Sequence, residues 1–134
     1  MGLFDIFKKK KTKSAKEPSS PDKLWELWAE GKVGSPYAEL MTYQSEINNG
    51  GHDQYFLNIG NTGDTEKAMT ALEQILPEKL NANLKKAYEA YIALEENEDD
   101  DEAEDAMDEC DDTYYKYEEE INRILEEYAS RIEE

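Results

Sequence analysis

The stretch MDECDDTYYKYEEEINRILEEYASRI, residues 107–132, decides the fold of this chain. Apolar and aromatic side chains recur in it at steps of three and four: Met107, Cys110, Tyr114, Tyr117, Ile121, Ile124, Tyr128 and Ile132. Because an α-helix turns once in about 3.6 residues, these side chains share one face. We predict a long C-terminal helix whose apolar seam packs either against a helix of the same chain or against its copy in a homodimer.

The chain before this stretch shows the same spacing, interrupted by breaks. Residues 80–92 carry a second stripe, formed by Leu80, Leu84, Ala87, Tyr88, Tyr91 and Ile92. Glycine and proline fall between the periodic stretches, which predicts earlier helices near residues 24–31, 36–50, 53–59 and 64–76, and a fifth from Pro77. Asp64 or Thr65 can cap the fourth of these helices. The sequence therefore predicts an all-α fold, with one compact domain of about six helices and no strands.

The charge divides the chain into two parts. The 134 residues include 33 acidic and 15 basic side chains, so the net charge is −18. Residues 1–16 hold six lysines against one aspartate, which leaves −23 for the other 118 residues. We predict a flexible basic tail and linker at residues 1–21 and an acidic helical domain at residues 22–134.

This composition excludes several classes of function. Strong negative charge repels phosphates, so direct binding to nucleic acid is not expected. No apolar run is long enough for a membrane span or a secretory signal, and we expect a cytoplasmic protein. Cys110 is the only cysteine, and the carboxylates around it disfavour the thiolate. Neither a disulfide nor a cysteine nucleophile is expected.

Residues 95–112 contain thirteen carboxylates and no base: Glu95, Glu96, Glu98, Asp99, Asp100, Asp101, Glu102, Glu104, Asp105, Asp108, Glu109, Asp111 and Asp112. A fully helical segment would carry one charge in about 2 Å of axis, against about 1.7 Å for duplex DNA. Imitation of nucleic acid is therefore physically possible. The simpler interpretation is a solvated loop that keeps the protein soluble. No glycine follows Gly63, which argues against an EF-hand calcium loop.

The N-terminal tail has the composition of a membrane-surface segment. Apolar side chains precede a lysine cluster there, in the order Leu3, Phe4, Ile6, Phe7, Lys8, Lys9, Lys10 and Lys11. Such a segment can make weak contact with anionic lipid. The alternatives are a disordered tail and one that folds back onto the acidic domain.

Residues 48–58 read NNGGHDQYFLN and form a corner between two predicted helices. Two glycines allow a sharp change of direction, while Tyr55, Phe56 and Ile59 are expected in the core. We expect Gln54 and Asn58 to bond to exposed backbone groups at the corner. His52 is the only histidine, so a metal site with several imidazoles cannot form within one chain. An enzyme would have to use His52 together with Asp53 and Gln54; we expect no catalytic residue, metal or cofactor.

This corner resembles the motif N-N-G-G-aromatic-x-Q-Y-F-x-N of a bacterial domain-of-unknown-function family, whose members are acidic and all-helical and include a DNA mimic. The matching residues are Asn48, Asn49, Gly50, Gly51, His52, Asp53, Gln54, Tyr55, Phe56, Leu57 and Asn58. His52 departs from the usual aromatic. The resemblance covers about residues 22–134. It implies a non-enzymatic, all-helical domain, with a homodimer as one arrangement, whose carboxylates occupy the DNA-binding surface of a partner.

The sequence thus predicts a binding protein that engages a basic partner, such as a DNA-binding protein, through an acidic surface. The surface comprises the carboxylates of residues 95–112 and four on the last helix, Glu118, Glu119, Glu126 and Glu127. Two alternatives remain open at this point. One is a membrane-peripheral adaptor held at lipid by the tail, and the other is an immunity-type protein that neutralises a basic toxin.

Overall fold

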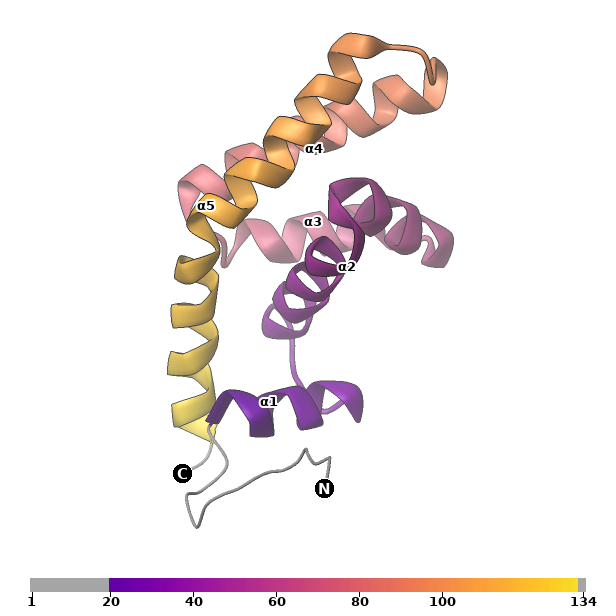
Figure 1. Cartoon of the computed structure of the whole chain (residues 1–134). Coiled ribbons are helices and arrows are strands. Elements are labelled where there is room, and N and C mark those ends of the chain that lie inside the picture. Colours follow the sequence, from indigo (N-terminus) through magenta and orange to yellow (C-terminus); the bar gives the residue numbers. More distant parts are fainter. Residues whose placement is uncertain (1–19, 133–134) are drawn as a thin grey trace, which may run out of the picture.

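Residues 20–132 are described by a computed structural model and form five α-helices, with no strand among them (Figure 1). They are α1 (Ser20–Ala29), α2 (Tyr37–Thr62), α3 (Thr65–Glu73), α4 (Glu78–Glu96) and α5 (Asp101–Ile132). The all-α prediction is confirmed. The tail residues predicted to touch membrane, Leu3 to Lys11, lie outside the described residues, and α1 begins just before the predicted domain boundary at residue 22. None of the five helices is long and apolar enough to cross a membrane.

The predicted count of about six helices is wrong, because the segments expected near 36–50 and 53–59 are joined in α2. Gly51 leaves the helical conformation, with φ 80° and ψ −175°, so α2 bends there without an intervening loop. This conformation is accessible to glycine and strained for other residues. The break predicted at the paired glycines therefore exists as a kink inside one helix.

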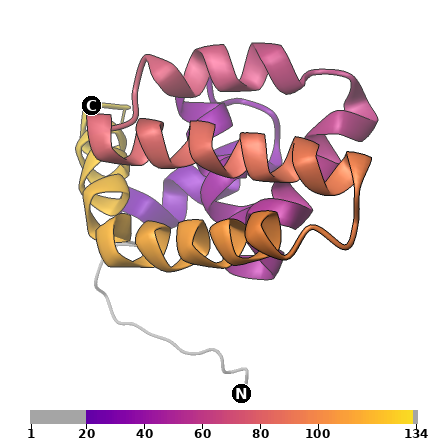
Figure 2. The same cartoon turned by 90° about the horizontal axis from the view of Figure 1, so that it is seen from above.

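The C-terminal helix pairs within the chain. Helices α4 and α5 form an antiparallel hairpin, joined by a short turn, and they make the most extensive contact between any two helices (Figure 2). The second half of α5 continues beyond α4 and runs past α1 (Figure 1). Of the two packing arrangements that the seam allowed, the structure shows the one against a helix of the same chain.

The core is built mainly from the predicted stripes. On α5, Met107, Cys110, Tyr114 and Ile121 are buried, while Tyr117, Ile124 and Tyr128 are half-buried against the core. Beyond Ile121 the buried face passes through Leu125 and Ala129, and Ile132 is exposed. An α-helix repeats every 3.6 residues, so the inner face of α5 drifts away from a seam of alternating three- and four-residue steps. In addition, α5 changes direction where it leaves α4 (Figure 1). On α4, Ile92 is also exposed, although the stripe of residues 80–92 predicted that it lies on the buried face.

One buried polar residue makes a helix contact that the stripes did not predict, and one predicted cap does not form its hydrogen bond. Asn83 is buried on α4, and its Nδ2 donates to the backbone carbonyl of Cys110, 2.8 Å away on α5. Asp64 stands at the N-cap position of α3 as predicted, but its side chain accepts no cap hydrogen bond. The carboxylate of Asp64 is therefore not used to hold its own helix.

Candidate functional site

The acidic segment is folded and forms the tip of the α4–α5 hairpin, so the interpretation as a loop is wrong. We call residues 95–112 the acidic hairpin. Its turn is held locally: the Asp99 amide donates to Oδ1 of Asn97 at 3.1 Å, and the Ala103 amide donates to Oδ1 of Asp100 at 3.0 Å. The second bond caps the N-terminus of α5. Most of these carboxylates consequently stand on regular helix.

Eleven of the thirteen predicted carboxylates in the acidic hairpin are exposed: Glu95, Glu96, Glu98, Asp99, Asp101, Glu102, Glu104, Asp105, Asp108, Glu109 and Asp112. They point outward because Ala103, Met107 and Cys110 occupy the inner face of α5. Within residues 20–132, this surface forms an ion pair with one base, Lys86, whose Nζ lies 3.5 Å from Oε1 of Glu109. An exposed pair of this length contributes little, so the surface stays strongly negative.

Asp111 belongs to the interior contacts and not to the free acidic surface. Its Oδ1 accepts from the His52 backbone amide at 2.9 Å and lies 2.7 Å from His52 Nδ1. The amide donor becomes available because Gly51 interrupts the helix just before it. A Cβ on Gly51 would come within 2.5 Å of Oδ2 of Asp111. Glycine is therefore required both by the backbone conformation and by the carboxylate packed against it.

His52 continues a buried chain of hydrogen bonds to Tyr43. The Tyr43 hydroxyl lies 2.6 Å from His52 Nε2, and both side chains have no exposed surface. All three groups are satisfied when the hydroxyl donates to Nε2 and Nδ1 donates to Asp111. Burial, and then the charge of neighbouring groups, raises the pKa of the Tyr43 hydroxyl well above its usual range. These hydrogen bonds tie the two halves of α2, which carry Tyr43 and His52, to Asp111 on α5.

Glu118 is a second structural carboxylate among the predicted partner-binding residues. Its Oε2 accepts hydrogen bonds from Gln44 Nε2 at 3.3 Å, Asn48 Nδ2 at 2.8 Å and the Tyr114 hydroxyl at 2.9 Å. Burial, followed by the charge of Glu118, raises the pKa of Tyr114. The other three predicted residues of α5, Glu119, Glu126 and Glu127, are exposed.

The amides of the 48–58 motif bind carboxylates. Gln54 and Asn58 both donate to Oε1 of Glu46, at 2.7 and 3.0 Å, so the prediction that they bond to backbone groups is wrong. Tyr55, Phe56 and Ile59 are buried as predicted. The motif thus builds the α2 bend, and its neutral amides bind the carboxylates of Glu46 and Glu118. The cluster of side-chain amides in residues 48–58 was the sequence signal for this role.

The remaining candidate features are a carboxylate-lined groove and the thiol of Cys110. A groove beside the acidic hairpin is lined by five carboxylates, which are those of Asp53, Glu95, Glu98, Glu104 and Asp108. No group of three or more His, Cys, Asp or Glu residues in residues 20–132 is arranged to hold a metal ion. Cys110 is buried, and this burial raises the pKa of its thiol.

A family model described as DMP19-like protein matches residues 37–132. The chain belongs to the DMP19-like family. The match includes the 48–58 motif and the acidic hairpin, and it confirms the resemblance to a family that includes a DNA mimic. It begins at Tyr37, so α1 lies outside it, although the resemblance was expected to begin near residue 22. No curated protein and no solved structure shows a significant match to the chain.

Proposed function

We propose that this DMP19-like protein is a non-enzymatic DNA mimic that occupies the nucleic-acid-binding surface of a basic partner protein. The observation that carries the proposal is the acidic hairpin, where eleven carboxylates are exposed on two helix ends and the turn between them, and one exposed lysine pairs with Glu109. The family match to DMP19-like proteins supports it independently.

The density of charge on α5 suits this role. Seven exposed carboxylates lie between Asp101 and Asp112. At a rise of about 1.5 Å per residue they occupy about 18 Å of helix, which is one charge in about 2.6 Å before the α4 carboxylates are added. Duplex DNA carries one in about 1.7 Å. The two densities are of the same order, and the helix holds the carboxylates in place before the partner arrives.

Binding would be electrostatic. Lysine and arginine side chains of the partner would meet the hairpin carboxylates as they meet phosphates, and association would weaken steeply with salt. Asp111 and Glu118 take no part in this surface because their oxygens accept hydrogen bonds inside the fold.

The test is retention of cytosolic proteins by the immobilised full chain at low salt, with duplex DNA as competitor. We expect DNA to displace a discrete DNA-binding protein. The substitutions Asp99→Asn, Glu102→Gln and Asp105→Asn together should weaken this partner's binding about 100-fold, since each removes an exposed charge. The matched control carries Glu26→Gln, Glu66→Gln and Glu78→Gln, three exposed carboxylates away from the hairpin, and should lose less than about threefold.

Equal losses in the two triple variants would show that net charge, and not the hairpin, governs binding. A partner that DNA does not displace would contradict mimicry. Circular dichroism of both variants checks that the helices remain.

A further inference from the structure

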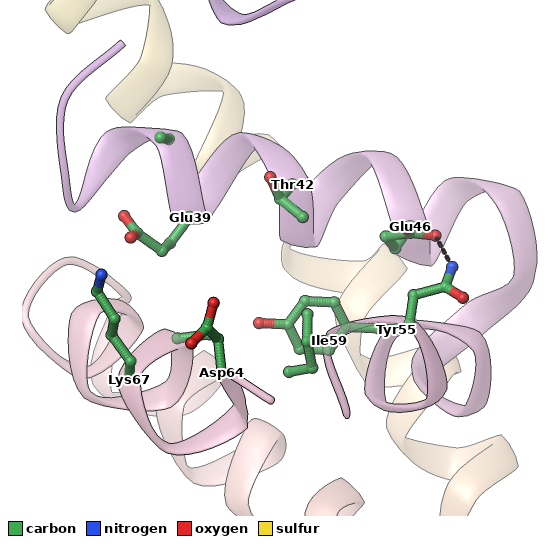
Figure 3. A pocket seen from close by; sticks show the side chains of 10 residues that line it. Glu39, Thr42, Glu46, Tyr55, Ile59, Asp64 and Lys67 are labelled. Atoms are coloured by element: carbon green, nitrogen blue, oxygen red, sulfur yellow. Dashed lines mark hydrogen bonds between the residues drawn. The ribbon is translucent and has the colours of Figure 1, made fainter. Parts of the chain in front are cut away.

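A second negatively charged cleft lies apart from the acidic hairpin, between the two halves of α2 and α3 (Figure 3). Its lining includes three carboxylates, Glu39, Glu46 and Asp64, and one ammonium group, that of Lys67. Lys67 is exposed and stands at the edge of the cleft, facing Glu39 (Figure 3). None of its lining residues belongs to the acidic hairpin. The cleft is therefore a separate feature that the proposed mimicry does not use.

The Tyr55 hydroxyl has no hydrogen-bond partner in this cleft. The Tyr55 side chain is 1% exposed, and its hydroxyl oxygen is buried and unpaired. Figure 3 shows the hydroxyl directed into the space between α2 and α3, on the side of Asp64. Buried hydroxyl groups are almost always paired, because an unmade hydrogen bond destabilises the fold. An unpaired hydroxyl aimed into a charged cleft indicates a polar ligand.

The charge of the cleft indicates a cation. Burial, and then the charges of Glu39 and Glu46, raises the pKa of Tyr55, so negative potential reaches the hydroxyl and keeps it protonated. Glu46 is held by Gln54 and Asn58, and Oε1 of Glu39 accepts from the Ser35 hydroxyl at 2.8 Å. The Asp64 carboxylate makes no cap hydrogen bond to α3. Asp64 and the second oxygen of Glu39 thus remain as acceptors in the same cleft as the Tyr55 hydroxyl.

We propose that this cleft binds the guanidinium group of an arginine, with N–H groups donating to Asp64, to Glu39 and to the hydroxyl oxygen of Tyr55. A guanidinium group presents five N–H donors in one plane and has no acceptor, which matches several oxygens arranged around a site better than a single ammonium does. The aliphatic stem of the arginine would lie against Ile59 and Ala68, which also line the cleft. We take this arginine to be a side chain of the basic partner protein, and that assignment rests on the proposed function.

The experiment measures binding of a small arginine probe to the full chain without any partner. Titration of the ¹⁵N-labelled protein with Nα-acetylarginine N-methylamide should give saturable NMR shifts at Tyr55, Asn58 and Ala68, with a dissociation constant of about 1 to 10 mM. The neutral isostere Nα-acetylcitrulline N-methylamide should bind at least about tenfold more weakly, because it lacks the charge.

Two variants and a control assign the contacts. Tyr55→Phe removes only the unpaired hydroxyl, and Asp64→Asn removes one carboxylate charge. Each variant should bind the arginine probe about fivefold more weakly, or weaker still, than the parent chain. Glu66→Gln makes the same charge change on the first turn of α3, outside the cleft lining, and should change affinity less than about twofold.

Shifts that do not saturate, equal binding of the citrulline compound, or unchanged affinity in both Tyr55→Phe and Asp64→Asn would overturn the proposal. Because no partner is present, these outcomes are independent of the pull-down. A specific arginine site in a protein whose hairpin variant still retains its partner would support the cleft and contradict mimicry by the hairpin.

Discussion

In the acidic hairpin, Glu109 leaves 71% of its side chain exposed, whereas Asp111, two residues further along α5, leaves 28% exposed and accepts two hydrogen bonds from His52. Asp111 belongs to a second group, which we call the α2–α5 junction and define by Tyr43, Gln44, Asn48, Gly51, His52, Asp111, Tyr114 and Glu118. The same chemical group faces solvent in one region and organises the fold in the other. Charge alone therefore does not tell which carboxylates are available to a partner.

The largest expected effect is at the bend of the junction. Gly51→Ala should lower the free energy of unfolding by about 4 kcal/mol, because alanine is strained in this conformation and its Cβ would lie 2.5 Å from Oδ2 of Asp111. Urea unfolding followed by circular dichroism measures the change. Gly34→Ala is the matched control, since no atom lies within 4 Å of its Cβ, and it should be close to neutral. Equal effects at the two glycines would contradict the role of the bend.

The second-largest expected effect is a lower free energy of unfolding at alkaline pH. The pKa values of Tyr43 and Tyr114 are raised above 10.0 in the folded protein, so the unfolded chain releases these protons first. Their contribution is fully present below pH 10 and is lost as pH rises above it. We expect a loss of about 3 kcal/mol for the two groups at pH 11, measured by urea unfolding at pH 8 and pH 11. An equal free energy of unfolding at pH 8 and pH 11 would contradict this expectation.

Asp111 and its neighbour Asp112 give a sharper comparison. Asp111→Ala should cost about 2 kcal/mol, because it leaves the His52 amide and ring nitrogen without their acceptor. Asp112→Ala removes an exposed carboxylate of the same helix and should change stability by less than about 0.5 kcal/mol. Thermal or urea unfolding of the two variants measures the difference. Similar losses of stability in both variants would contradict the distinction between the junction and the exposed acidic surface.

The smallest effect on stability is expected in the acidic hairpin itself. The triple variant Asp99→Asn, Glu102→Gln and Asp105→Asn should be as stable as the parent, or more stable by about 0.5 kcal/mol, because repulsion between neighbouring carboxylates is relieved. The same unfolding measurement applies. A large loss of stability would show that the hairpin charges also hold the fold together.

The helices could be predicted from local patterns, and most partners of the carboxylates could not. The stripes of α4 and α5 identified buried residues such as Leu84 and Tyr114, and the paired glycines marked the bend. The bonds of Asp111 and Glu118 join residues 59 and 70 positions apart in the sequence. Among 33 acidic residues, no local pattern distinguishes the few that turn inward.

The candidate surfaces divide in the same way. The apolar inner face of α5 leaves most of the hairpin carboxylates exposed on its outer side. The cleft around Tyr55 was not predicted, because its walls come together only when α3 folds against the bend of α2. The fold class was thus accessible from periodicity, whereas the arrangement of charges required the three-dimensional contacts.

The bend at Gly51 also sets an order of events during synthesis. The amide of His52, freed by this bend, is bonded to a carboxylate that lies 59 residues later in the chain. While the ribosome is still making α4, the carboxylate of Asp111 does not yet exist, and the His52 amide can only bond to water or to another acceptor. The hydrogen bonds that hold the α2 bend to α5 can therefore form only after Asp111 has been synthesised.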